Sequence, residues 1–159
     1  DELMAGMERA GAEFAAVTLH VGPGTFLPVQ CERVADHVMH RERYSIAESV
    51  AARINRAHAE GRRVVCVGST TLRTVESACR DGVVVAGDGV SQLFIHPGYR
   101  WQIADALLTN FHLPRSTLLM LVAAMAGVAP VMAAYRHAIA ARYRFYSYGD
   151  AMFIAQRAC

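Results

Sequence analysis

Residues 63–79, RVVCVGSTTLRTVESAC, decide the fold class of this chain. The run from Arg63 to Val67 is apolar and rich in β-branched residues, which predicts a short, fully buried strand. Gly68 follows at once, and apolar residues between Leu72 and Cys79 then recur at helical spacing. A buried strand that leads directly into a helix is typical of α/β proteins with parallel strands.

Upstream of this stretch, Phe14 to Val21 is apolar and predicts another buried strand. It ends at residues 22–25, Gly-Pro-Gly-Thr, which predict a tight loop. Ser45 and Glu48 have the spacing of a capping box, in which the serine oxygen accepts a backbone N–H three residues on. We therefore expect a helix behind Ser45 that ends near Gly61.

Downstream, residues 82–89 are rich in turn formers, Gln92 to His96 predicts a strand, and Ala151 to Ile154 predicts a closing strand. Residues 118–134 carry no charged or polar side chain, a length that reaches the lower limit for a membrane span. Glycine and proline interrupt this stretch between Gly127 and Pro130, which favours two short buried helices with a break between them.

The composition is that of a folded protein and gives no sign of a nucleic-acid-binding surface. Hydrophobic residues make up 53% of the chain and charged residues 19%, which excludes a disordered chain, and the formal charge is only +2. The 4 cysteines are scattered without a C-x-x-C pair, so we expect a reducing, cytoplasmic setting. Because strands alternate with helices, we predict an α/β fold with a mixed, mostly parallel sheet flanked by helices.

Gly68-Ser69-Thr70-Thr71 is the most informative candidate site. Hydroxyl groups and backbone N–H groups converge there at the start of a helix, where the helix dipole favours an anion such as a phosphate or a carboxylate. The alternative is that Ser69 or Thr70 simply caps the helix. The stretch has neither the lysine nor the spacing of a Walker A loop.

Histidines supply the candidates for proton transfer. His20 lies at the end of a predicted strand, where open α/β sheets place ligands, although a structural histidine bonded to backbone is the alternative. His37 and His40 lie close in sequence to Asp36 and Glu42, but this set falls short of a metal site with known spacing. Acid–base chemistry or phosphate binding therefore suits the two histidines better.

Two further polar clusters follow late in the chain. Asn110 and His112 precede Pro114, whose bend can direct both side chains into one cavity, or the amide can satisfy nearby backbone groups. Residues 143–150, YRFYSYGD, interleave aromatic rings with Arg144. Such rings can stack on an unpaired base and the arginine can bind phosphate, although ordinary core packing is the alternative.

The order of these clusters along the chain resembles one family. Residues 17–26 read VTLHVGPGTF, residues 67–73 read VGSTTLR, and residues 109–114 read TNFHLP. The full set of matching stretches is 17–26, 36–40 with Glu42, 67–73 with Glu76, 97–99, Asp105, 109–114, 116–118, 143–145 and 147–154. On these motifs the chain resembles the C-terminal half of the S-adenosylmethionine:tRNA ribosyltransferase-isomerases, which act in queuosine biosynthesis.

The resemblance implies that residues 1–159 are the C-terminal portion of an α/β catalytic domain whose N-terminal strands and inserted β-barrel domain are missing here. It implies S-adenosylmethionine as co-substrate, no metal, and a cytoplasmic enzyme that is a monomer at full length, with no membrane partner. The implied partner is tRNA with 7-aminomethyl-7-deazaguanine at the wobble position, and the products are epoxyqueuosine-tRNA, adenine and methionine.

Three alternatives stay open: an incomplete fragment or one half of a split enzyme that needs its N-terminal partner, an S-adenosylmethionine-dependent methyltransferase, and a tRNA-binding module without chemistry. The implied reaction needs a base, donors that help adenine leave, and an anchor for methionine. The acid–base candidates are His20, His37, His40 and His112. The substrate-binding candidates are Gly22, Gly24, Thr25, Ser69, Thr70, Thr71, Arg73, Asn110, Arg144, Tyr146, Tyr148 and Asp150.

Overall fold

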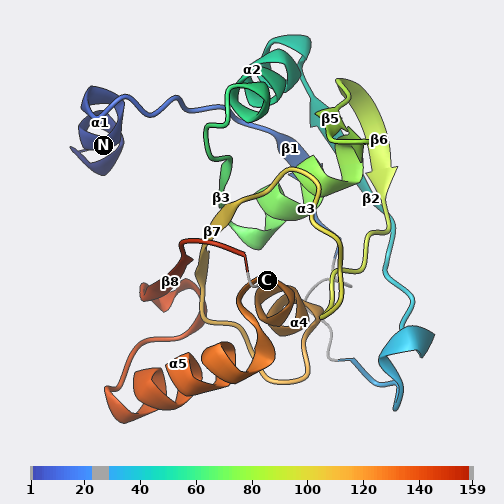
Figure 1. Ribbon diagram of the computed structural model, residues 1–159. Helices are drawn as coiled ribbons and strands as arrows, with labels where there is room; N and C mark the ends of the chain where they lie inside the picture. Colours follow the sequence, from blue (N-terminus) through green and yellow to red (C-terminus); the bar gives the residue numbers. More distant parts are fainter. Residues whose placement is uncertain (1, 23–28, 158–159) are drawn as a thin grey trace.

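The computed structural model describes residues 2–22 and 29–157 (Figure 1). In chain order the elements are α1 (Glu2–Arg9), β1 (Thr18–His20), the 3-10 helix η2 (Val34–Asp36), β2 (Glu42–Ile46), α2 (Glu48–Ala59), β3 (Val65–Val67), α3 (Ser69–Ala78), β4 (Cys79–Arg80), β5 (Val83–Val84), β6 (Gly87–Ser91), β7 (Ala106–Asn110), α4 (Thr117–Ala126), α5 (Val128–Ala140), the 3-10 helix η3 (Tyr146–Tyr148) and β8 (Ala151–Ile154).

The strands form small sheets of mixed direction, which confirms the predicted α/β class. One sheet has the order β3-β7-β8, a second has the order β1-β2-β6, and β4 pairs with β5. The expectation of mostly parallel strands is wrong, because β3 with β7 is the only parallel pair within the described residues. Two helices, α4 and α5, separate β7 from β8, so the chain re-enters the sheet at the carboxyl end of β7 and runs antiparallel to it.

The hydrophobic core consists of two clusters that meet at α3. In the first, Leu107 of β7 packs with Val122 of α4, and in the second Ile46 of β2 packs with Val75 of α3. Leu72 of α3 belongs to the first cluster, so neighbouring positions of one helix serve the two halves of the core. The sheet β3-β7-β8 is seen nearly end-on in Figure 1, with α3 and α4 on its right-hand side.

The strand–glycine–helix unit of residues 63–79 is confirmed as β3, Gly68 and α3. Cys66 of β3 is buried in the core, and burial raises the pKa of its thiol to about 12, so it behaves as a small hydrophobic residue. The prediction that β3 is buried on both faces is wrong. Val65 and Val67 point to the other face of the strand and are exposed.

Two local predictions fail because strand pairing overrides them. Ser45 lies in β2, between Thr18 of β1 and Asp88 of β6, and the helix α2 starts at Glu48 without a side-chain cap. The strand expected over Gln92–His96 lies instead just upstream, as β6. Gly89 of this strand lies against the ring of Tyr44, which leaves no room for a Cβ.

The apolar stretch of residues 118–134 forms α4 and α5, and the predicted break is at Gly127, where φ is +86°. Ser116 caps α4 by accepting the N–H of Leu119 at 3.1 Å. No single helix of the described chain has the length and apolarity to cross a membrane. Only α4 and α5 taken together do, and they are bent by 115°.

Candidate functional site at the carboxyl ends of two parallel strands

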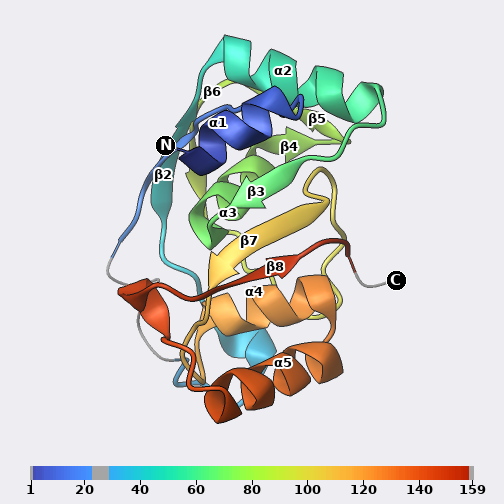
Figure 2. The ribbon, with the colours of Figure 1, turned by 90° about the vertical axis from the view of Figure 1, so that its left-hand side faces the viewer.

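The candidate site begins where the parallel strands β3 and β7 end side by side. Val67 pairs with Leu108, and the N–H of Gly68 donates to the carbonyl oxygen of Leu108 at 2.8 Å. The arrowheads of both strands point to the same side in Figure 2. The first turn of α3 therefore lies beside the last residues of β7, Thr109 and Asn110, the edge at which open α/β sheets bind ligands.

The first turn of α3 is free of a side-chain cap in the part of the chain that the structure describes. Gly68 occupies the N-cap position with φ +86°, so the alternative that Ser69 or Thr70 caps the helix is wrong. The hydroxyl of Thr71 donates to the carbonyl oxygen of Val67 at 2.7 Å. Thr70 is exposed beside these uncapped N–H groups, an arrangement that favours an anion.

Arg73 is more deeply buried than residues 68–71, with which it was predicted to bind an anion. Its guanidinium is buried and forms an ion pair with the buried carboxylate of Glu42 in β2. The other carboxylate oxygen of Glu42 accepts the N–H of Gly22 at 3.0 Å. The pair thus ties α3 to β2 and to the start of the glycine loop. A direct role of Arg73 in holding an anion stays a prediction, and Gly24 and Thr25 lie outside the described residues.

His112 follows β7 and is largely buried. Its Nε2 lies 3.0 Å from the hydroxyl of Thr109, with donor and acceptor roles that depend on the tautomer. Its backbone N–H donates to the hydroxyl of Tyr135 at 2.7 Å. Burial lowers the pKa of His112 to about 4. The imidazole is therefore neutral near pH 7. It can donate or accept a hydrogen bond, but it is a weak proton acceptor.

The low pKa of His112 predicts a loss of stability in acid. The folded state takes up this proton only near pH 4, whereas the unfolded chain takes it up near 6.5. The free energy of unfolding should therefore fall as the pH drops from about 6.5 to 4, by up to about 3 kcal/mol. Urea unfolding at each pH measures this slope. A His112→Gln variant should show a slope reduced by that amount, and an unchanged slope would contradict the burial of a neutral histidine.

Asn110, Arg144 and Asp150 meet at the same edge, because Asn110 of β7 pairs with Ala151 of β8. The amide of Asn110 donates to the carbonyl oxygen of Asp150 at 3.3 Å. The backbone N–H and the guanidinium of Arg144 both donate to the Asp150 carboxylate, and they lower the pKa of that exposed carboxyl group. The structure therefore brings these three predicted residues together.

The tyrosines of the same segment face outward. The N–H of Tyr146 donates to the carbonyl oxygen of Phe111 at 3.1 Å, which fixes the segment against the end of β7. Tyr146, Tyr148 and Arg144 all have exposed side chains. The alternative of ordinary core packing is therefore wrong for these two tyrosines, whereas Phe145 does pack against the core.

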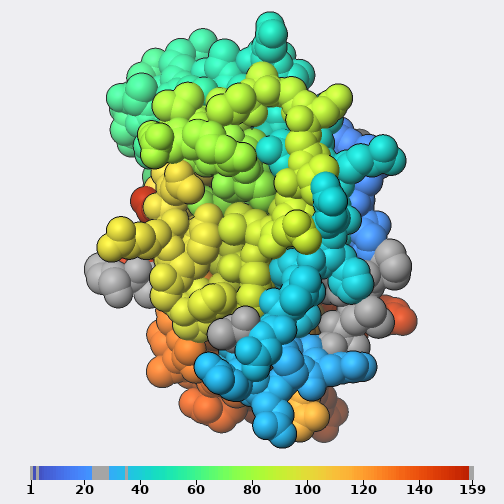
Figure 3. Space-filling view, turned by 90° about the vertical axis from the view of Figure 1, so that its right-hand side faces the viewer, coloured from blue at the N-terminus to red at the C-terminus, as the bar shows by residue number. Residues whose placement is uncertain are grey.

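The other predicted histidines are spread over the molecule. His20 is exposed at the end of β1, opposite Arg43 of β2. The ring of His37 packs against Phe94 at 5.0 Å, and the segments that carry these two rings run side by side over the face shown in Figure 3. His40 is exposed shortly before β2. No group of three or more His, Cys, Asp or Glu side chains in the described ranges could hold a metal ion, and the expected lack of a metal stays a prediction.

Glu76 is a buried carboxylate that was not among the predicted site residues. It accepts hydrogen bonds from the Tyr99 hydroxyl at 2.8 Å and from the N–H groups of residues 102, 103 and 104 at 3.1, 3.0 and 2.9 Å. These bonds fix the segment that leads into β7. Glu76 lies four residues after Leu72, on the apolar side of the predicted helix. This position indicates a carboxylate that is buried and hydrogen-bonded.

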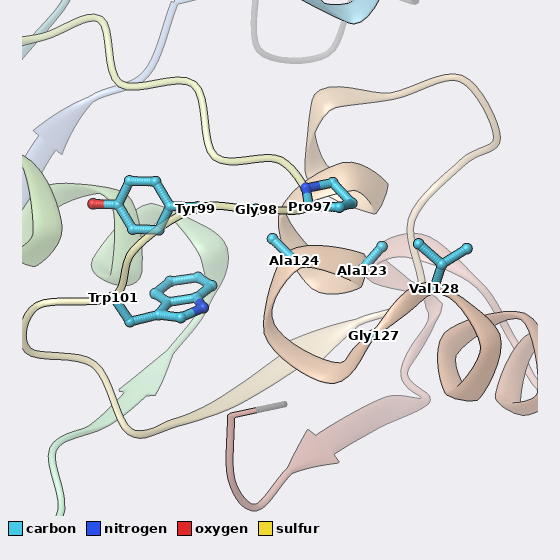
Figure 4. Close-up of a pocket in the computed structure, with 8 residues that line it drawn as sticks. All are labelled: Pro97, Gly98, Tyr99, Trp101, Ala123, Ala124, Gly127 and Val128. Atoms are coloured by element: carbon cyan, nitrogen blue, oxygen red, sulfur yellow. The ribbon is translucent and has the colours of Figure 1, made fainter. Parts of the chain in front are cut away.

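The segment held by Glu76 lines a pocket of about 320 Å³ (Figure 4). One wall is formed by Pro97, Gly98, Tyr99 and Trp101, and the rings of the last two meet edge to face at 5.0 Å. The other wall, at the junction of α4 and α5, is formed by Ala123, Ala124, Gly127 and Val128. The segment of residues 97–101 precedes β7, whereas the predicted residues gather where β7 ends, so this pocket and the candidate site lie toward opposite ends of the strand.

Comparison with known proteins identifies the family. The family model described as "Queuosine biosynthesis protein" matches residues 1–154. The S-adenosylmethionine:tRNA ribosyltransferase-isomerase of Aromatoleum aromaticum is 54% identical over 155 residues, which are 98% of this chain and 45% of that protein. The protein of the same name from Thiobacillus denitrificans is 57% identical over 148 residues, which are 93% of this chain and 43% of that protein.

A solved structure supports the same relationship. The crystal structure of S-adenosylmethionine tRNA ribosyltransferase from Thermotoga maritima matches with a TM-score of 0.76 and 42% sequence identity, over 96% of this chain and 48% of that chain. The chain therefore spans about 45% of the curated relatives it matches. These matches confirm the resemblance that the motifs indicated, and the chain belongs to the queuosine biosynthesis protein family.

Proposed function

We propose that the carboxyl-edge site, defined as residues 68–71 and 109–112, binds S-adenosylmethionine in a tRNA ribosyltransferase-isomerase. The observation that carries this proposal is the hydrogen bond of Gly68 to Leu108, which sets an uncapped helix start beside Asn110 and the neutral His112. One end of this site suits an anion and the other offers uncharged hydrogen-bonding groups. S-adenosylmethionine has a carboxylate at one end and an adenine at the other.

In the proposed reaction the ribosyl group of S-adenosylmethionine is transferred to the aminomethyl group of 7-aminomethyl-7-deazaguanine in tRNA. The transferred group rearranges to the epoxy-cyclopentanediol of epoxyqueuosine, and adenine and methionine leave. The relatives are named S-adenosylmethionine:tRNA ribosyltransferase-isomerases, which supports this reaction class. S-adenosylmethionine is consumed as a co-substrate, and we expect the reaction to take place in the cytoplasm.

The geometry suggests a division of roles within the site. The N–H groups at the start of α3 and the hydroxyl of Thr70 would hold the methionine carboxylate. Asn110 and Asp150 would orient the ribose. His112, with its pKa near 4, suits a hydrogen-bonding role better than that of the base. Among the histidines this leaves His20, exposed at the end of β1, as the preferred base, whereas His37 and His40 stay predictions.

The outward-facing group of Arg144, Tyr146 and Tyr148 is the proposed contact with tRNA. The three side chains are exposed and come directly before β8, whose first residue pairs with Asn110 at the candidate site. Exposed aromatic rings can stack on an unpaired base, and arginine can bind a phosphate. A modified wobble base would then lie beside the bound S-adenosylmethionine.

A binding measurement tests the site directly. In the chain assembled with the remainder of a relative, Thr70→Val and Asn110→Ala should each weaken S-adenosylmethionine binding about tenfold or more in calorimetry, because each loses a hydrogen bond to the ligand. Gln156→Ala, an exposed polar residue beyond β8, is the control and should bind like the unmodified protein. Unchanged affinity in both site variants would contradict the placement of S-adenosylmethionine at this edge.

The second candidate function is that of one half of an enzyme that needs a partner polypeptide. The observation that favours it is the apolar face of the sheet β3-β7-β8, where Val67 and Phe153 are exposed. Activity of the chain by itself would exclude this candidate. Activity only after addition of the remainder of a relative would support it.

A further inference from the structure

Two residues close to the carboxyl-edge site have a backbone conformation that favours glycine. Arg115 has a φ of +57° and Tyr146 has a φ of +59°. A side chain in this left-handed region is unfavourable because its Cβ crowds the following carbonyl oxygen. Within the described chain two other non-glycine residues share the conformation, Asp81 in the turn between β4 and β5 and Arg142 at the end of α5. Backbone strain of this kind clusters at functional sites, which directs attention to the first two residues.

Arg115 follows the carboxyl-edge site directly, in the turn that leads into α4. It comes after Pro114, and a turn with a proline followed by a residue of positive φ normally has glycine or asparagine at that second position. The carbonyl oxygen of Arg115 accepts the N–H of Val29 at 2.8 Å, and the hydroxyl of Ser116 donates to the carbonyl oxygen of Leu113 at 2.8 Å. A glycine at position 115 could form the same backbone bond. The turn itself therefore does not require an arginine.

The side chain of Arg115 is exposed, and it forms no hydrogen bond or ion pair within residues 2–22 and 29–157. Two other arginines near the site differ in this respect, since Arg144 is paired with Asp150 and Arg73 with Glu42. A guanidinium stays charged at any physiological pH, and its planar fork matches the oxygen atoms of a phosphate or a carboxylate. An exposed arginine in this position therefore suits an anionic group of a substrate.

The position of Tyr146 favours a phosphate over a carboxylate. Its N–H donates to the carbonyl oxygen of Phe111 at 3.1 Å, four residues before Arg115, so the segment with the exposed ring is joined to the segment with the exposed guanidinium. A ring and an arginine together suit a nucleotide, whose base can stack on the ring while its phosphate binds the guanidinium. The carboxylate of S-adenosylmethionine has the uncapped start of α3 in the proposed site.

We propose that Arg115 is a further substrate-binding residue, which holds a phosphate of the tRNA backbone beside the nucleotide on which the enzyme acts. This inference rests on the proposed function and adds to it a residue that the sequence motifs did not single out. A phosphate contact fixes the register of a nucleic acid without reading its sequence, so Arg115 positions the nucleotide and does not select its base. Glycine at this position would relieve the strain and lose the contact.

The salt dependence of tRNA binding tests the contact. The protein used is the chain assembled with the unmatched part of the Aromatoleum relative, that is, the part which this chain does not cover. Arg115→Gln should weaken tRNA binding at least about fivefold and reduce the slope of log K against log salt concentration by about one, because one phosphate contact is lost. Arg115→Lys keeps the charge and should keep the slope. Arg136→Gln, which changes an exposed arginine of α5, is the matched control and should alter neither.

A stability measurement separates a binding role from a structural one. Arg115→Gly relieves the left-handed conformation, so its midpoint of urea unfolding should equal or exceed that of the unmodified chain, while its affinity for tRNA falls as in Arg115→Gln. A lowered midpoint would mark Arg115 as a structural residue and count against the inference. The affinity for S-adenosylmethionine in calorimetry should be the same in all of these variants.

The outcomes distinguish this inference from the proposed function. If the assembled enzyme binds tRNA and Arg115→Gln leaves affinity and salt slope unchanged, the inference is overturned and the proposed function stands. Weaker binding of S-adenosylmethionine with unchanged binding of tRNA would also overturn it, since the anion would then be the methionine carboxylate. An unmodified assembled enzyme that does not bind tRNA would contradict the proposed function, and the inference with it.

Discussion

Replacing Arg73 by methionine is expected to lower the free energy of unfolding by about 3–5 kcal/mol, among the largest effects of a single substitution in this chain. The side chain of Arg73 is 3% exposed and that of Glu42 is 0% exposed, so the variant leaves a carboxylate buried beside an apolar side chain. The same carboxylate accepts the N–H of Gly22, so the loss of its guanidinium partner also affects the start of the glycine loop. Chemical denaturation of the two chains measures the difference.

A double-mutant cycle and a surface control make this expectation specific. Adding Glu42→Gln to Arg73→Met removes the unpaired charge and should restore part of the lost stability. Arg53→Met is the control, because Arg53 forms its ion pair with Glu13 at the surface, where such pairs contribute less than about 1 kcal/mol. If Arg73→Met lowers the free energy of unfolding no more than Arg53→Met does, the ion pair of Arg73 with Glu42 does not join α3 to β2 as described.

The second large effect is expected at His20. In the assembled enzyme, His20→Ala should lower turnover at least about a hundredfold if this side chain removes the proton beside the sulfonium. Burial holds the pKa of His112 near 4, and the ring of His37 is packed against Phe94, so His20 is the exposed imidazole nearest the glycine loop in sequence. Single-turnover rates with saturating S-adenosylmethionine measure the chemical step apart from binding.

The control for His20 is His58→Ala, an exposed histidine on α2 that should leave turnover unchanged. A pH profile adds a readout that a structural defect would not mimic, since loss of the base removes the rise in rate that accompanies its deprotonation. Turnover near that of the unmodified enzyme in His20→Ala would remove this residue from the mechanism. The proton acceptor would then have to be sought at His40, His112 or a residue of the unmatched part.

Local patterns in the sequence predicted the elements that local chemistry determines. The strand–Gly68–helix unit, the break at Gly127 and the closing strand β8 are all confirmed. The predictions that fail concern segments whose structure is determined by residues distant in sequence. Ser45 is recruited into a sheet by β1 and β6, and the strand expected after Ser91 lies before it because β2 pairs there.

In the candidate site, too, the sequence predicted some features, whereas others depend on long-range contacts. The ends of β3 and β7 were predictable because residues after parallel strands meet at one edge, and Asn110, Arg144 and Asp150 do meet there. The buried partners Glu42 and Glu76 were missed as site residues, since their hydrogen bonds reach residues 20 to 31 positions away. The spacing of residues in the sequence does not predict such long-range contacts. A carboxylate or an arginine within an apolar helix face does indicate that the side chain has a buried partner.

The most direct test of the proposed function is the product balance of a single reaction. The chain, alone and assembled with the unmatched part of a relative, is incubated with S-adenosylmethionine and tRNA that carries 7-aminomethyl-7-deazaguanine, and the products are measured by mass spectrometry. We expect adenine, methionine and the epoxyqueuosine nucleoside in equal amounts from the assembled protein. S-adenosylhomocysteine with methylated tRNA, or no product from a folded and assembled protein, would contradict the proposed function.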